Sequence, residues 1–305
     1  MAVNCYETEY KNYGKCICLE NGIIKLIATI DLGPRIIYFG LCGKENILFE
    51  DCERNFSEKN GNYGTWYSYG GHRLWVAPEE LTETYYPDNE KVAYSYENNT
   101  LTLIQPETPF KKQLSIVCKM ADSENYVSIE NKIKNCSDNI AHFAPWSITA
   151  LAPAGVEIIP LNTADSGFLP NRAISFWSYT DIYDNRFKLF NHAAILKHDS
   201  SCNKAFKVGF NVNDGYCAYI LRNQLFIKNF GSYENVKYPD FSSNFETYTN
   251  NYFLECELVG EERDYKPSEV ASISETWEIM SFEGTIPQDN EQVTEFLNKH
   301  KSIND

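Results

Sequence analysis

The sequence predicts an all-β protein built from antiparallel strands, and three observations carry this prediction. Apolar and polar residues alternate with a period of two, most clearly over residues 206–212. Short turn-forming clusters, such as residues 97–100 and 136–139, separate the strand-like runs. Only residues 287–299 have a convincing helical pattern. We therefore expect a mainly β domain with little helix outside this C-terminal segment.

The strand-like runs are rich in β-branched and aromatic residues. From the N-terminus onwards they cover residues 23–30, 35–39, 92–96, 100–105, 113–120, 125–134, 206–212, 215–221 and 271–280. Their spacing predicts about 15 to 20 strands. In the C-terminal helix, Asp289 and Gln292 have the spacing of a capping box. No repeat, low-complexity tract or linker interrupts the chain, so we expect residues 1–305 to form a single domain.

Composition limits the partners and the compartment. The chain has 27 Lys and Arg against 42 Asp and Glu, a net charge of -15, which does not favour nucleic acid. The N-terminus lacks the apolar segment of a secretory signal, and no run approaches the roughly 18 apolar residues of a membrane span. We expect a soluble cytoplasmic protein without a membrane partner. The ten cysteines are scattered and include no Cys-x-x-Cys pair, so no metal site is predicted.

The first candidate site is the segment SYGGHRLWVAPE, residues 68–79, which follows a loop rich in aromatic residues. If the segment is extended, His72 and Leu74 share one face and Arg73 and Trp75 share the other. Only one pair then faces a given cavity, unless a bulge at the glycines redirects a side chain. Rings beside charged groups suit a sugar, whose C–H faces stack on rings while its hydroxyls need donors and acceptors. Two alternatives to a sugar site stay open. In one, the aromatic rings fill the core of a β-sandwich, and in the other, His72 is a structural residue held by hydrogen bonds.

The second candidate is the strand FLECEL, residues 253–258. Leu254, Cys256 and Leu258 form an apolar face, so Glu255 and Glu257 share the opposite one. Two carboxylates on one face repel each other, which tends to raise one of the two pKa values toward that of a useful base near neutral pH. A solvated outer face of an acidic protein is the alternative interpretation.

The third candidate is the segment 140–149, in which His142 and Trp146 lie on one face of a strand. Pro145 within it indicates an edge strand, a bulge or the rim of a site. The sequence contains no Gly-x-Ser-x-Gly, phosphate-loop, dinucleotide-binding or His-Glu-x-x-His motif, so serine hydrolase, nucleotide and zinc-protease functions lack support.

Together these motifs resemble a bacterial family within the galactose mutarotase-like (aldose 1-epimerase) superfamily. The matching pieces, in order, are DLGPRIIYFG, GGHRLWVAPE, FAPWSIT, YTDIYDNRF, LFIKNF, YPDFSSNFETY, FLECEL and ETWEI. They span most of the chain, and their order is more specific than any one of them. The resemblance implies an antiparallel β-supersandwich with a sugar site on the concave face of a large sheet.

The resemblance also implies roles for individual residues. Glu255 matches the general base of the mutarotases. Where they carry the histidine acid, this chain has Trp146 or Ser147, so His72, with His142 as an alternative, is the candidate acid. The residues that the resemblance and the motifs assign to substrate binding are Arg73, Trp75, His142, Trp146, Lys228, Asp240 and Glu257.

The sequence thus predicts a carbohydrate-binding protein that acts as an aldose 1-epimerase without cofactor or metal. Glu255 would remove the anomeric proton, and a histidine would protonate the ring oxygen. A non-catalytic sugar-binding or sensing module is the alternative, and a polysaccharide lyase or hydrolase is a third, because one fold hosts several functions. The sugar and the oligomeric state stay open at this point.

Overall fold

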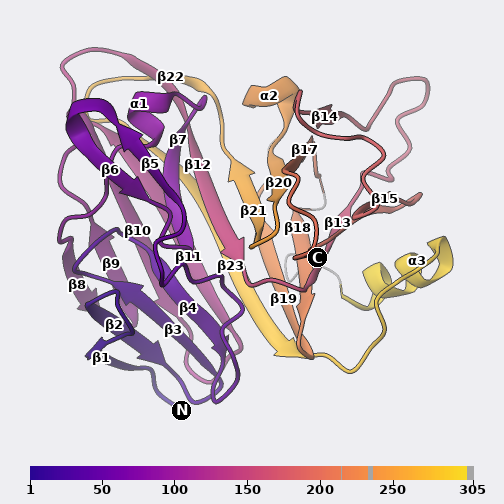
Figure 1. The fold of residues 1–305 in the computed structure, drawn as a ribbon, viewed down its shortest axis with the longest axis horizontal. Helices are drawn as coiled ribbons and strands as arrows, with labels where there is room; N and C mark the ends of the chain where they lie inside the picture. Colours follow the sequence, from indigo (N-terminus) through magenta and orange to yellow (C-terminus); the bar gives the residue numbers. More distant parts are fainter. Residues whose placement is uncertain (214, 233–235, 301–305) are drawn as a thin grey trace.

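Two large sheets lie face to face in the computed structural model, which describes residues 1–213, 215–232 and 236–300 (Figure 1). Every strand pairing among these residues is antiparallel. The predicted all-β, antiparallel supersandwich is therefore confirmed. The described residues contain 23 strands, more than predicted, because several have only three residues and show no visible alternation.

The first sheet holds the candidate segments. Its strands, in spatial order, are β1 (Asn4–Glu9), β2 (Lys15–Glu20), β3 (Ile24–Thr29), β4 (Ile36–Leu41), β7 (His72–Ala77), β12 (Ala141–Leu151), β21 (Leu254–Val259), β20 (Phe245–Thr249), β17 (Phe206–Phe210) and β14 (Ile174–Phe176), with β22 (Arg263–Tyr265) also paired to β12. Segments from the two halves of the sequence thus meet at its centre (Figure 1).

The second sheet covers one face of the first. Its strands, in spatial order, are β15 (Phe187–Leu189), β16 (Ala193–Lys197), β13 (Val156–Pro160), β18 (Tyr216–Leu221), β19 (Gln224–Phe230), β23 (Val270–Ser281), β11 (Tyr126–Asn135), β10 (Lys112–Met120), β9 (Thr100–Ile104) and β8 (Ala93–Glu97). The main apolar core draws side chains from both sheets. Within it, the Trp277 ring packs edge-on against Phe39 and Phe226, with centroids 5.4 and 5.5 Å apart.

Smaller elements complete the chain. A hairpin of β5 (Ser57–Asn60) and β6 (Gly64–Tyr67) encloses a 3-10 turn at Gly61–Tyr63, and the short helices are α1 (Leu81–Thr84) and α2 (Pro239–Ser242). The predicted C-terminal helix is α3 (Asn290–Lys299), where the Asp289 side chain accepts a hydrogen bond from the Gln292 backbone as an N-cap. Its Val293 and Phe296 pack on the outer face of the second sheet.

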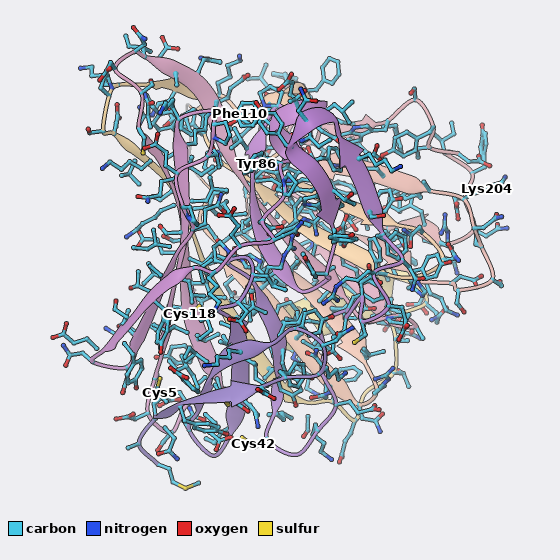
Figure 2. The ribbon with its side chains drawn as sticks, turned by 60° about the vertical axis from the view of Figure 1, so that its left-hand side comes forward. Cys5, Cys42, Tyr86, Phe110, Cys118 and Lys204 are labelled. Carbon is cyan, nitrogen blue, oxygen red and sulfur yellow. The ribbon has the colours of Figure 1, made fainter. Side chains whose placement is uncertain are left out.

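The hairpin is held by rings from distant segments. Tyr86 and Phe110 lie together in Figure 2, with ring centroids 5.9 Å apart, and Tyr63 packs against both. This contact fixes the hairpin that precedes β7, whose strand β6 carries Trp66 to the cavity described below. No helix of the described residues has the length and apolar character needed to cross a membrane.

Pro145 lies in a central strand rather than at an edge. It sits where β12 changes partner, because residues 141–143 pair with β22 and residues 146–151 pair with β21. Its carbonyl accepts a hydrogen bond from the Gly260 backbone. A proline is tolerated at this interruption of the ladder because it has no N–H to donate.

Candidate functional site

A cavity of about 280 Å³ lies on the face of the first sheet that points away from the second. Strands β7, β12, β21, β20 and β17 form its floor. It is lined by Phe56, Trp66, Ser68, Arg73, Trp75, Glu79, Tyr85, Trp146, Ile148, Tyr179, Lys207, Tyr248, Asn250, Phe253, Glu255 and Glu257. Eight of these are aromatic and five carry a formal charge, a composition that suits a polar ligand with apolar faces.

Strand register brings the charged residues together. Ile148 is opposite Arg73 on one side and Glu257 on the other, and Glu257 is opposite Glu246. One row along, Tyr248 is opposite Glu255 on one side and Lys207 on the other. Because paired residues of adjacent strands point to the same side of a sheet, all these side chains emerge on the cavity face.

Arg73 and Glu255 form an ion pair that crosses over strand β12. Arg73 Nη2 donates to Glu255 Oε1 at 3.0 Å, and the guanidinium lies over the Trp75 ring, 4.2 Å from its centroid. Burial raises the pKa of Glu255, an effect that Arg73 opposes and the nearby Glu257 reinforces. Glu255 is therefore a carboxylate of increased basicity whose side chain faces the cavity.

Lys207 lies between two other carboxylates. Its Nζ is 2.7 Å from Glu246 Oε2 and 3.0 Å from Glu257 Oε2, and Glu257 Oε2 also accepts from the Trp146 indole at 2.9 Å. Burial alone would lower the pKa of Lys207, but Glu257 and Glu246 outweigh it and raise that pKa. For Glu246, burial and the charge of Glu257 prevail over Lys207 and raise the pKa to about 8. The ammonium of Lys207 thus forms ion pairs with two buried carboxyl groups.

Aromatic rings form one wall of the cavity. The Trp75 ring contacts Trp66, Tyr85 and Trp146, with centroids 5.4, 5.2 and 5.3 Å apart. The ammonium of Lys207 lies 4.6 Å from the ring centroids of both Trp146 and Trp177. These packed rings form a rigid surface on which the C–H face of a sugar can stack.

The structure brings five of the predicted site residues together. Arg73, Trp75, Trp146, Glu255 and Glu257 all line the cavity. The expected alternation holds on both strands, because the residues between them, such as Leu74 and Cys256, point into apolar clusters instead.

His72 and Lys228 do not reach the cavity, which is a correction to the predicted site. Both are completely buried between the two sheets, where Lys228 pairs with Glu275 at 3.0 Å. The His72 ring bonds to Thr149 and Asn131, each at 2.9 Å, and burial lowers its pKa to about 4 although Glu275 opposes this. His72 is on the opposite face of β7 from Arg73, so it cannot deliver a proton to a ligand in the cavity.

His142 and Asp240 also lie outside the cavity lining. His142, at the start of β12, is about half exposed and pairs with Asp264 at 2.8 Å and with Glu262 at 3.5 Å. Asp240 is exposed in α2, where its backbone carbonyl accepts from Ser175 and Ser243. Neither location supports the expected sugar contact.

Sequence reasoning missed several cavity residues. Lys207 falls on the polar side of the alternation over residues 206–212, but its burial depends on carboxylates from other strands. Glu246, which pairs with the cavity residue Lys207 but does not itself line the cavity, lies within the segment YPDFSSNFETY; its position opposite Glu257 is visible only once the strand pairing is known. The other lining residues outside the predicted set are Phe56, Trp66, Ser68, Glu79, Tyr85, Ile148, Tyr179, Tyr248, Asn250 and Phe253.

Comparison with solved structures identifies the architecture. A galactose mutarotase-like protein from Lactobacillus casei superposes with a TM-score of 0.55 at 10% identity, over 87% of this chain and 100% of that one. A provisionally named aldose 1-epimerase from Escherichia coli gives 0.55 at 10% identity, over 92% and 100%. The chain has the galactose mutarotase-like fold. At such low identity the likeness concerns the fold alone.

A fold similar to that of this chain also occurs within a longer protein. A TPR-domain containing protein from Parabacteroides distasonis gives a TM-score of 0.62 at 14% identity, covering 91% of this chain but 48% of that one. The present chain thus spans about half the length of that protein. No family model and no curated protein matches the sequence.

Proposed function

We propose that the cavity binds a carbohydrate and that the chain interconverts its anomers as an aldose 1-epimerase. One observation carries the proposal: Glu255 is a buried carboxylate of raised pKa that faces a cavity walled by aromatic rings. The ring wall suits the C–H face of a sugar, while the carboxylates, Arg73 and Lys207 offer acceptors and donors for its hydroxyls. The names of similar folds agree with this class of ligand.

In the proposed reaction, Glu255 accepts the proton of the anomeric hydroxyl. The C1–O bond to the ring oxygen breaks, the ring oxygen takes up a proton, and the C1=O group of the open chain forms. Rotation about the C1–C2 bond and reversal of these steps give the other anomer. Arg73 holds Glu255 Oε1, which orients the carboxylate, and each well-placed acid or base contributes roughly 10²- to 10⁴-fold.

The proton donor distinguishes this proposal from its alternative, a non-catalytic sugar-binding module. Within the described part of the chain, the cavity lining includes no histidine. Lys207 and three tyrosines are the lining groups considered as general acids, and burial raises the pKa of Tyr85, Tyr179 and Tyr248. Groups that hold their protons so firmly are weak general acids, which favours a slow epimerase or a binding protein.

The test combines binding with anomer exchange. Calorimetry with a panel of neutral monosaccharides and disaccharides identifies a ligand, and polarimetry on freshly dissolved α-anomers measures its interconversion. We expect Glu255→Gln to lower the rate about 10²- to 10³-fold while affinity changes only a few-fold, because the amide keeps the shape and loses the basicity. Glu257→Gln should reduce the rate much less.

The control is Glu97→Gln, an exposed carboxylate on the edge strand β8, which should leave rate and affinity unchanged. Full activity in the Glu255 variant would remove that residue from the mechanism. A wild type that binds sugar without exchanging its anomers would favour the binding module. Failure to bind any sugar at millimolar concentration would overturn both. Chain cleavage of a polysaccharide, the third expectation, fits less well, because the cavity is small for several sugar units.

A further inference from the structure

A second group of reactive side chains lies between the two sheets, behind the cavity. It consists of Glu157 on β13, Cys217 on β18 and Cys256 on β21. One ligand atom from each lies within 4.8 Å of the other two, and the two Sγ atoms are 3.0 Å apart. All three side chains are buried, and the described residues contain no other such group. Two thiols and a carboxylate of different strands thus converge on one point.

Glu157 is the unexplained member of this group. It is fully buried, and neither carboxylate oxygen has a hydrogen-bond partner of normal geometry. Burial raises the pKa of Glu157 to about 8, although Thr247, Cys256 and Lys228 favour its charged form. The Thr247 hydroxyl, also buried, likewise has no hydrogen-bond partner of normal geometry. Burial of a carboxylate lowers the stability of a folded protein by several kcal/mol, as a rough order, unless the carboxylate is paired or coordinates a metal.

We propose that Glu157, Cys217 and Cys256 bind one thiophilic divalent metal ion, for which Zn²⁺ is the natural candidate. Two thiolates and one carboxylate are a ligand set that Zn²⁺ accepts, and the Thr247 hydroxyl, opposite Cys256 in the sheet, or a water molecule would be the fourth ligand. Zn–S bonds of about 2.3 Å in a tetrahedral site require the sulfurs to separate by less than 1 Å from their present distance.

The charge balance of the surroundings is compatible with this ion. Two thiolates and a carboxylate carry one negative charge more than a divalent cation neutralises. The Lys228 ammonium lies beside the group, donating to the Cys256 carbonyl at 3.2 Å, and it is itself paired with Glu275. Its positive charge lies beside the group, and because Glu275 balances that charge, the bound ion and its three ligands would keep one net negative charge.

The ion would link the strands that carry the cavity residues to the opposite sheet. Cys256 lies between Glu255 and Glu257 on β21, and Thr247 lies between Glu246 and Tyr248 on β20. Their side chains point away from the cavity by strand alternation. A metal bound to β21, β13 and β18 would fix the backbone that presents both glutamates.

The test uses the full chain, unfolded and then refolded with and without Zn²⁺ under reducing conditions. We expect about one zinc per chain by elemental analysis after removal of free metal, and a higher thermal midpoint than for the metal-free protein. Refolding with Co²⁺ should give a thiolate-to-cobalt charge-transfer absorption. Cys217→Ser and Cys256→Ser should abolish that absorption, whereas Glu157→Gln should keep it with at least about tenfold weaker affinity.

The matched control is Cys118→Ser, a buried cysteine of β10 outside the group (Figure 2), which should bind metal like the wild type. Refolded wild type without zinc and without the cobalt signal would overturn the proposal. So would a disulfide between Cys217 and Cys256 in the purified protein, seen as a mass two hydrogens lighter. Because the cobalt spectrum is read on the wild type, misfolding of a variant does not prevent a decision.

Discussion

We expect replacement of Lys207 by methionine to lower the stability of the protein, because two buried carboxyl groups share the one positive charge of Lys207. Methionine fills a similar volume but removes the charge within 2.7 and 3.0 Å of Glu246 and Glu257, both almost fully buried. Removal of one partner of a buried ion pair typically costs about 3–5 kcal/mol. In the folded variant, the pKa of Glu246 must rise further, because the stabilising charge is gone while burial and repulsion by Glu257 remain.

The sign of the pH dependence follows from this rise. A carboxyl group with a higher pKa in the folded than in the unfolded state binds more protons when folded, so stability falls as pH rises through the folded pKa. Urea unfolding followed by circular dichroism should therefore show a smaller loss for Lys207→Met near pH 5 than near pH 8. The double variant Lys207→Met/Glu246→Gln should recover part of the loss at the higher pH.

The control for Lys207→Met is Lys204→Met, three residues earlier. Lys204 lies at the outer edge of the molecule (Figure 2), and its exposed side chain is 3.9 Å from Asp181. A surface pair of this kind contributes about 0–1 kcal/mol. Equal destabilisation of the two variants, or a Lys207 effect that does not change with pH, would refute the reasoning.

Two further predictions concern the same face of the sheet. The first rests on the pKa of Glu246, which is raised to about 8. The wild type should therefore lose stability relative to Glu246→Gln as the pH rises from about 5 to about 8, by a few kcal/mol at most. Parallel pH profiles of the unfolding free energy for the two proteins would contradict this. The second concerns Trp75→Ala, which removes the ring at the centre of the aromatic wall and should weaken sugar binding, measured by calorimetry, at least about tenfold. The control Trp177→Ala should weaken binding less, because the Trp177 ring does not line the cavity. Equal losses of affinity in the two variants would count against stacking on Trp75.

The sequence could predict which side chains share a face of a strand, but not which face meets the cavity and which meets the second sheet. Alternation depends on the local backbone alone. The sequence therefore sufficed to predict that Arg73 shares a face with Trp75, and Glu255 with Glu257. Whether His72 or Arg73 meets the cavity depends on the position of the second sheet. That position is set by contacts between residues far apart in sequence, such as His72 with Asn131.

Burial of charge was also inaccessible from the sequence. Lys207 reads as a solvated lysine until Glu246 and Glu257 are placed beside it. The group Glu157, Cys217 and Cys256 is invisible for the same reason, because its members are 60 and 39 positions apart in the chain. Short-range spacing rules for metal ligands do not apply to residues that converge only after two sheets have packed.

The ion pairs of the cavity have a consequence for how the strands can align. Arg73 reaches over β12 to Glu255, and Lys207 reaches over β20 to Glu257, so each pair joins strands that are not neighbours. A slip of β21 by two residues would keep every side chain on its proper face and would preserve the apolar pattern. It would also shift each glutamate by roughly 7 Å along the strand. One of the two cations would then lose its carboxylate on β21, so the spacing of the charges specifies an alignment that hydrophobic alternation alone leaves degenerate.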